Sequence, residues 1–389
     1  MKISKVEAFP VTTPLHKPFV MPGTHITGID SVVVKIHTDE GLVGFADSGD
    51  TSTWYRGETQ ESIIGMLCEH IAPRFLIGQD PRDIEKIVGW MDLFVRDNNQ
   101  AKATVDFALH DLKGKILDTP VYQLLGGRCA EASVQGWVAS AGSPEQVVPE
   151  ALTALEKGFC LIKLKTGHGT IDDDVATVRA VREAVGDDVR LTVDVNGFWN
   201  YDQALKTLRR LDAYNLECVE QPLPHWDIEG LARLRDRIGT PVFADESAQE
   251  PHHLKEIIDR RAADGLFIKM QKAGGLLKAQ RWLTLARLAD LPVMSGCMIG
   301  SGLEASPSAH LMVADQWASQ FTHENLGPLI IHGRWDTDGE PVTEDIARNV
   351  PVFADGRLYP NEGAGFGIEL NEDFLARNIT RDKTSRVVR

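Results

Sequence analysis

Three acidic residues recur along the chain at similar intervals, each in a short apolar run. Asp194 lies in LTVDVNG, Glu220 in CVEQPLP and Asp245 in VFADES. If these runs are neighbouring parallel strands, their carboxyl ends bring the three carboxylates together at one mouth of a barrel. Carboxylates that close raise one another's pKa unless a cation lies among them, and all-oxygen ligation suits Mg²⁺, with Mn²⁺ as a substitute. The spacing therefore predicts a divalent metal site, since unrelated loop residues or helix caps would not recur in phase.

Two lysines lie inside the apolar run LIKLK, where side chains two residues apart share one face of a strand. Lys163 and Lys165 therefore point the same way, and a predicted helix on each side favours the buried face over an exposed edge. Lys269 ends the run LFIK, four predicted strands further along the chain. Strands four apart face each other across an eight-stranded barrel, so these lysines would flank a molecule bound at the metal from opposite sides.

Opposed lysines beside a metal ion suit acid and base chemistry at carbon. A neighbouring ammonium group and a divalent cation both lower the pKa of a lysine, so that it can accept a proton at neutral pH. A metal-bound carboxylate has a weakly acidic α-carbon, and the divalent ion stabilises the enediolate that deprotonation forms. Two lysines could serve the two faces of that carbon, or one could act alone while the other balances charge. A Schiff-base aldolase that uses one of the three lysines is an alternative from another reaction class.

The runs that carry these residues alternate with longer amphipathic runs from about residue 130 onward. Consecutive predicted strands follow one another after about 25 to 30 residues, and parallel strands need such helical crossovers. The predicted strands cover 133–139, 159–165, 189–195, 216–222, 240–246, 265–271, 290–296 and 318–325. Eight of them predict a (βα)₈ barrel, and an open doubly wound sheet is disfavoured because no G-x-G-x-x-G turn follows the first strand.

The chain before the barrel has an α+β pattern. KISKVEAFPV and SVVVKIHTDEGLVGFAD predict an antiparallel meander with a turn at 38–41, and helical patterns follow at 57–75 and 97–117. The expected division is an α+β capping domain at 1–125, a modified (βα)₈ TIM barrel at 126–349 and a C-terminal segment at 350–389 that returns to the cap.

The composition excludes several classes of protein. A hydrophobic fraction of 43% and a charged fraction of 25% are typical of an ordinary globular protein. A net charge of −15 argues against a nucleic-acid partner, and no run has the pattern of a signal peptide or a membrane span. The five cysteines are scattered without a C-x-x-C pair, which favours reduced thiols in the cytoplasm over a disulfide framework or zinc site.

The motifs in combination resemble the enolase superfamily, and within it the muconate-lactonizing (muconate cycloisomerase) subgroup of the mandelate racemase/muconate lactonizing enzyme family. K-x-K, D-x-N-G, E-Q-P, A-D-E-S and K-x-x-x-A-G-G occur in this order and at the family's spacing, and the resemblance spans essentially the whole chain. It implies the fold described above, a small-molecule carboxylate substrate, Mg²⁺ as cofactor and a homo-oligomer, with no membrane partner.

The resemblance also implies roles for individual residues. It makes Asp194, Glu220 and Asp245 the metal ligands. It makes Lys163, Lys165 and Lys269 the acid/base group, with Lys165 and Lys269 as the opposed pair. It places three further polar residues beside the ligands, the lysines or the substrate, namely Asn196, Glu246 and Glu324.

The specific reaction depends on less regular features. The run THENLGPLII is similar to muconate cycloisomerases through Glu324, Gly327, Pro328 and Leu329. The Asp-x-Asp of dipeptide epimerases is absent, and the seventh predicted strand lacks the histidine of the mandelate-racemase branch. Gly300 departs from the subgroup, where a glutamate is common.

We therefore expect Mg²⁺-dependent abstraction of the proton α to a carboxylate, giving a metal-stabilised enolate, in a muconate cycloisomerase-like isomerase. The alternatives are a racemase or epimerase of an N-substituted amino acid, a dehydratase of a hydroxy acid and, more remotely, a non-catalytic metal-binding barrel.

In the family that the chain resembles, cap loops choose the substrate. Segments 14–30 and 47–59 lie between predicted cap strands and the next element, as lid loops would. The residues of these segments that could shape the pocket are Met21, His25, Trp54 and Tyr55. The equal alternative is that the segments are mobile exposed loops whose aromatic residues are incidental. His168 and His323, which adjoin the motifs, are either extra proton carriers or polar residues of the surface and the pocket wall.

Overall fold

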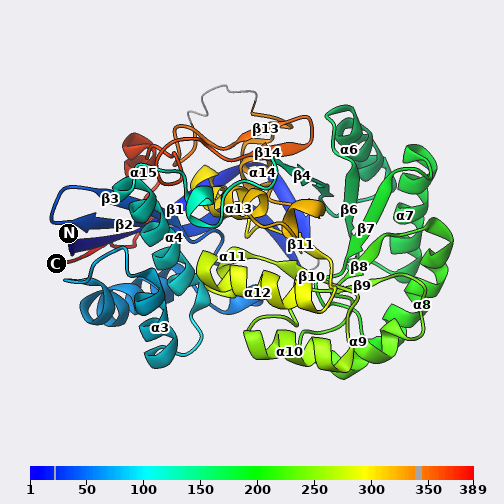
Figure 1. Cartoon of the computed structure of the whole chain (residues 1–389). Helices are drawn as coiled ribbons and strands as arrows, with labels where there is room; N and C mark the ends of the chain where they lie inside the picture. The colour runs from blue at the N-terminus through cyan, green and yellow to red at the C-terminus, as the bar shows by residue number, and fades with distance from the viewer. Residues whose placement is uncertain (22, 338–343) are drawn as a thin grey trace.

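The computed structural model describes residues 1–21, 23–337 and 344–389. A cap built mainly from the N-terminal segment packs against a curled parallel sheet surrounded by helices (Figure 1). The predicted α/β class, with an α+β cap and a modified barrel, is confirmed. Among the described helices, none combines the length and apolar character that a bilayer span needs.

The cap begins with an antiparallel sheet and continues as helices. Its elements are β1 (Ile3–Met21), β2 (Thr24–Thr38), β3 (Val43–Asp47), α1 (Thr53–Arg56), α2 (Gln60–Gly65), the π-helix η1 (Met66–Leu76), α3 (Ile84–Phe94), α4 (Asn99–Ile116) and α5 (Val121–Leu124). β2 lies between β1 and β3, and its run of β-branched residues is buried on both faces. Such a doubly covered strand has a continuous apolar sequence rather than an alternating one.

The helix α4 fastens the cap to the barrel. Nearly all of its residues are buried, including charged ones. Asp106 Oδ1 accepts a hydrogen bond from the backbone N–H of Leu276 at 2.6 Å, on the barrel side. Asp111 Oδ2 accepts one from the backbone N–H of Phe45 at 2.9 Å, on the cap side. Buried polar groups with partners of this kind fix one relative placement of the two parts.

The barrel strands follow the predicted cadence. They are β4 (Ser133–Gln135), β5 (Trp137–Ala139), β6 (Leu161–Lys165), β7 (Arg190–Asp194), β8 (Cys218–Glu220), β9 (Val242–Ala244), β10 (Gly265–Ile268), β11 (Val293–Ser295) and β12 (Thr322–His323). In the described part of the chain, one parallel sheet has the order β11-β10-β9-β8-β7-β6-β5. A bridge between Gly296 and Glu324 and the pairing of β12 with β4 continue the sheet toward closure.

Helices alternate with these strands. They are α6 (Pro144–Glu156), α7 (Ile171–Val185), α8 (Tyr201–Leu211), the 3₁₀ turn η2 (Asp212–Tyr214), α9 (Ile228–Arg235), α10 (Pro251–Arg260), α11 (Met270–Ala273), α12 (Leu276–Leu288), α13 (Gly302–Ala314), the 3₁₀ turn η3 (Ala318–Gln320) and α14 (Gly327–His332). In Figure 1, α6 to α10 form an arc on the side of the molecule away from the cap.

Two strand predictions need correction. The predicted strand at 133–139 divides at Gly136, so that β4 pairs with β12 and β5 pairs with β6. A Cβ atom at Gly136 would lie 2.6 Å from the Leu161 side chain, which explains the glycine at this close approach. The segment 14–30 was expected to be a loop, but nearly all of its described residues belong to the long strands β1 and β2, which pair with Phe19 opposite Ile26. A register shift between Pro14 and Phe19 accommodates the prolines of this stretch within β1.

The C-terminal segment divides between the two parts of the molecule. Its elements are β13 (Val352–Ala354), β14 (Arg357–Tyr359), α15 (Glu372–Arg377) and β15 (Arg386–Val388). β15 pairs with β1 in the cap, as expected of a returning tail, and the two termini lie close together in Figure 1. The hairpin of β13 and β14 instead pairs with β4 of the barrel.

Candidate active site

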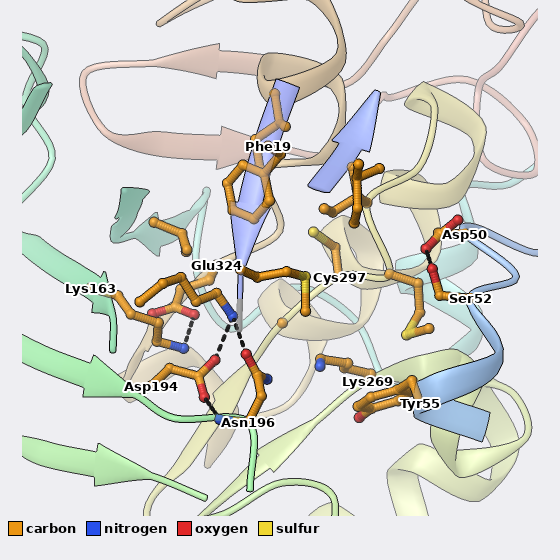
Figure 2. Close-up of a pocket in the computed structure, with 18 of the residues that line it drawn as sticks. Phe19, Asp50, Ser52, Tyr55, Lys163, Asp194, Asn196, Lys269, Cys297 and Glu324 are labelled. Atoms are coloured by element: carbon orange, nitrogen blue, oxygen red, sulfur yellow. Dashed lines mark hydrogen bonds and ion pairs between the residues drawn. The ribbon is translucent and has the colours of Figure 1, made fainter. Parts of the chain in front are cut away.

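The acids and lysines singled out in the sequence meet at the carboxyl ends of adjacent strands. Lys165 is the last residue of β6 and is paired in register with Asp194, the last residue of β7. Asp194 is in turn paired with Glu220, the last residue of β8. Asp245 and Lys269 directly follow β9 and β10. The structure thus gathers the predicted residues at one mouth of the barrel (Figure 2).

Lys163 lies deepest, between two carboxylates. Its amine is ion-paired with Glu220 and with Glu324, which follows β12, and it sits 3.8 Å from the ring centroid of Phe267. Burial alone would lower the pKa of Lys163, but the carboxylates of Glu220 and Glu324 outweigh it and raise the pKa above its ordinary value. Lys163 is therefore a fixed positive charge that holds two acids together.

Lys165 heads a chain of polar contacts along the mouth. Its Nζ donates to Asp194 Oδ2 at 2.6 Å and to Asn196 Oδ1 at 3.0 Å. Asn196 Nδ2 donates to Glu246 Oε1 at 2.9 Å. Burial, and then the charge of Asp245, raises the pKa of Glu246 to about 7. Glu246 therefore orients Asn196, which in turn orients Lys165.

Lys269 stands on the other side of the pocket, beside Asp245. Its Nζ donates to Asp245 Oδ2 at 2.8 Å and lies 4.1 Å from the ring centroid of Tyr55. Burial lowers the pKa of Lys269, but Asp245 and Glu246 outweigh that effect and raise it. The sequence predicted lowered pKa values for these lysines, but the pKa values of Lys163 and Lys269 are raised, because each amine faces carboxylates. A cation among the carboxylates would move these pKa values downward.

The cap reaches into the site through Tyr55. Its hydroxyl donates to Asp245 Oδ1 at 2.7 Å, and the next residue, Arg56, donates to Gln249 Oε1 at 2.9 Å. α1 is thereby fastened to the loop after β9. Burial, and then the charge of Asp245, raises the pKa of Tyr55, so the phenol remains a hydrogen-bond donor.

The three predicted ligands supply only carboxylate oxygens, the donors that Mg²⁺ prefers. Among the described residues, no three acidic, histidine or cysteine side chains are arranged so that they could bind one metal ion. Each of the three carboxylates is instead paired with a lysine amine. Burial, and then the charges of Asp194 and Asp245, raises the pKa of Glu220, so a cation among these strand ends would relieve their repulsion. The three carboxylates therefore suit Mg²⁺ as ligands. To bind the ion, each would have to turn from its lysine amine towards the metal.

The pocket above these residues has a volume of about 690 Å³, including the part that is open to solvent, and its walls are mainly apolar. The side chains of the wall include Phe19, Met21, Ile26, Trp54, Val138, Met298, Ile299 and Ile330. Met21, Trp54 and Tyr55 line the pocket as predicted, whereas His25 faces a neighbouring cavity. His25 is one residue from Ile26 along β2, and alternate residues of a strand point to opposite faces.

The two motif histidines do not reach the pocket. His168 is exposed on the loop after β6. His323 is fully buried, where Nδ1 accepts from the backbone N–H of Ser295 at 3.0 Å and Nε2 lies 3.0 Å from the carbonyl oxygen of Ala318. Burial lowers the pKa of His323 to about 4, so this ring is neutral and structural.

The departure at Gly300 has a structural counterpart in Glu304. A Cβ atom at Gly300 would lie 2.4 Å from the Cβ of Glu304, one helical turn later. The buried Glu304 carboxylate therefore occupies the space that a side chain at residue 300 would need, and it accepts a hydrogen bond from Gln271 Nε2 at 2.6 Å. Glu304 was not predicted from the sequence, although it lies only four residues after Gly300.

The fold and the site together define an enzyme of the enolase superfamily. Residues 3–126 match the family described as mandelate racemase / muconate lactonizing enzyme, N-terminal domain, and residues 146–374 match the family described as enolase C-terminal domain-like. The chain belongs to the mandelate racemase/muconate lactonizing enzyme family.

Relatives within this family carry out different reactions. A mandelate racemase/muconate lactonizing family protein from Azoarcus sp. EbN1 is 59% identical over 100% of both chains, with a TM-score of 0.95. N-succinyl-L-Arg/Lys racemase from Bacillus cereus is 35% identical over 96% of this chain and 97% of the relative. Muconate cycloisomerase 1 from Rhodococcus opacus is 31% identical over 96% of this chain and 98% of the relative. Family membership therefore establishes the broad class of isomerase and leaves the individual reaction to the pocket.

Proposed function

We propose that the enzyme removes and returns the proton on the carbon next to a substrate carboxylate, as a racemase or epimerase of an N-substituted amino acid. The observation that carries the proposal is the position of Lys165 and Lys269. They lie at the carboxyl ends of β6 and β10, four strands apart in the barrel, and line the same pocket. An amine on each face of one carbon can remove a proton from one side and donate a proton from the other.

The residues divide this work between them. Asp194, Glu220 and Asp245 would hold Mg²⁺, which when bound supplies positive charge next to the substrate carboxylate. Asn196 orients Lys165, and Tyr55 covers Lys269 and helps to exclude water. Lys163, fixed between Glu220 and Glu324, adds positive charge beneath the carboxylate.

Cycloisomerisation of a muconate-like diacid is the second candidate. It is favoured by the stretch from Glu324 to Leu329, which resembles the muconate-lactonizing subgroup, and by the identity to a muconate cycloisomerase. The lining of the pocket argues against it. Among the described lining residues, the only lysine or arginine side chains are Lys163, Lys165 and Lys269, so none is left for a second carboxylate.

Isotope exchange in D₂O with Mg²⁺ present distinguishes the two reactions. N-acyl amino acids are expected to lose the α-proton from both enantiomers, and cis,cis-muconate is expected to keep its dienoate absorbance. Lys165→Ala and Lys269→Ala are each expected to abolish racemisation, while each variant retains exchange of a different enantiomer. Lys255→Ala, which removes an exposed lysine of α10, is the matched control. Loss of dienoate absorbance without α-proton exchange would overturn the racemase proposal.

A further inference from the structure

One acidic side chain of the pocket has no part in the chemistry proposed above. Asp50 lies between β3 and α1, lines the pocket and is 8% exposed. Its backbone N–H donates to the carbonyl oxygen of Met298 at 3.0 Å, and its carbonyl oxygen accepts from Gln100 Nε2 at 2.8 Å. The barrel and α4 therefore fix its position. In Figure 2, Asp50 and Ser52 lie on the side of the pocket away from Lys163 and Asp194.

The Asp50 carboxylate has no cationic partner in the described part of the chain. It accepts hydrogen bonds from the hydroxyl of Ser52 and from the backbone of Asp30 and Ser52, and the charged side chain that shifts its pKa is another acid, Asp30. Lys383 lines the cavity on the far side of Asp50, but its amine is paired with Glu61 at 2.8 Å. Burial raises the pKa of Asp50 to about 6, which leaves the group mainly ionised at neutral pH. A buried carboxylate without a partner cation is costly, so a ligand that brings a positive charge would be favoured there.

The wall of the pocket as a whole also carries aromatic rings. Phe19 and Trp54 supply aromatic rings to the wall, and aromatic faces attract cations. The lysines of the described lining all belong to the acid cluster at the mouth of the barrel. An anionic group near Asp50 would thus meet a like charge, whereas an ammonium or guanidinium group would meet a carboxylate.

We propose that Asp50 binds a positively charged group at the end of the substrate remote from the reacting carboxylate. Because this inference rests on the proposed function, the substrate becomes an N-substituted amino acid whose side chain ends in a guanidinium or ammonium group. Asp50 is then the residue that selects the substrate, and Ser52 holds one of its oxygens in place.

Two nearly isosteric probes test the charge preference directly. Nα-acetyl-L-arginine carries a guanidinium group where Nα-acetyl-L-citrulline carries a neutral urea. With Mg²⁺ present, calorimetry on the wild type is expected to show binding of the arginine derivative at least about tenfold tighter, the range for a charged hydrogen-bonded pair. Asp50→Asn is expected to abolish this difference and to retain α-proton exchange on the citrulline derivative.

Two further variants make the test specific. Asp50→Glu keeps the negative charge and is expected to retain the preference, which separates a charge effect from a folding defect. Glu61→Gln changes a nearby acid outside the pocket and is expected to leave the preference unchanged. Equal affinity of the wild type for both probes, binding of neither probe, or an undiminished preference in Asp50→Asn would overturn the inference.

The failure of the inference and the failure of the proposed function give different results. If neither derivative exchanges its α-proton in the wild type, the proposed function fails, while the calorimetric comparison still decides the role of Asp50. If both derivatives exchange at equal rates with equal affinities, the racemase proposal survives and the role of Asp50 is lost.

Discussion

The amine of Lys272 lies 2.6 Å from the carboxylate of Asp245, and neither side chain has any exposed surface. The same amine donates to the carbonyl oxygens of Asp245 at 2.9 Å and Phe267 at 2.7 Å. Burial lowers the pKa of Lys272, although Asp245 opposes this shift. This ion pair ties the loop after β9 to α11, whose preceding residue is Lys269. Lys272 therefore positions both a predicted metal ligand and a predicted base.

Replacement of Lys272 is expected to damage stability and activity together. Lys272→Met removes one of the two lysine partners of the buried Asp245 and leaves Lys269 in place. The unfolding free energy is therefore expected to fall, but by less than the roughly 3 to 5 kcal/mol that a fully unpaired buried charge costs. Urea unfolding of the variant measures this cost. Lys255→Ala, which breaks an exposed pair with Asp259, is the control and is expected to change the unfolding free energy by less than about 1 kcal/mol. An unchanged urea midpoint in Lys272→Met would show that the buried pair of Lys272 and Asp245 does not contribute to the stability of the folded protein.

Tyr55 makes two separable contacts with the site, and two variants separate them. Tyr55→Phe keeps the ring over Lys269 but loses the hydrogen bond to Asp245. A lost hydrogen bond to a charged group corresponds to about 1.5 to 3 kcal/mol, so kcat/KM is expected to fall about tenfold to a hundredfold. Tyr55→Leu also loses the aromatic ring over Lys269, so its kcat/KM is expected to fall further than that of Tyr55→Phe. Equal kinetics for wild type and Tyr55→Phe would confine the role of this residue to packing.

Much of the fold and of the acid cluster could be predicted because both follow from a repeat. The period of strand and helix placed Asp194, Glu220 and Asp245 on neighbouring strand ends, and alternation within β6 placed Lys163 and Lys165 on one face. Short-range rules of this kind need only the order of residues along the chain.

The remainder depended on pairings between distant segments. The strands at 14–30 were missed because prolines are uncommon inside strands. The register of β1 is defined only by its pairing with β2, which the sequence does not show. Lys272 lies one helical turn after Lys269, but nothing in that spacing reveals that it is buried against Asp245. The isolation of Asp50 from cations is a property of the assembled pocket, so the sequence could mark it only as part of a lid segment.

Removal of Mg²⁺ is expected to abolish the activity of the enzyme reversibly. Chelation by EDTA should abolish α-proton exchange, and excess Mg²⁺ or Mn²⁺ should restore it. Binding of Mg²⁺ should also raise the unfolding free energy, by about 2.7 kcal/mol when the ion concentration is a hundred times Kd. Scanning calorimetry can measure this stabilisation without substrate. Asp194→Asn should lose this stabilisation, whereas Asp202→Asn, a change at an exposed acid of α8, should keep it. Indifference of both activity and stability to chelation would remove the metal from the mechanism.

Glu304 is expected to make the folded protein less stable as pH rises. Burial, and then the charge of Asp47, raises its pKa from 4.5 to about 7, so the folded state binds this proton more tightly than the unfolded state. The resulting stabilisation is complete below pH 4.5 and is lost as pH rises through about 7. The side chain of Glu304→Gln does not titrate, so the unfolding free energy of this variant relative to wild type should increase by about 2.5 kcal/mol between pH 5 and pH 8. Urea unfolding of both proteins across this range isolates the contribution of the one side chain. A difference that stays constant with pH would mean that Glu304 is ionised in the folded protein throughout, with a cation or water beside the oxygen that has no protein partner.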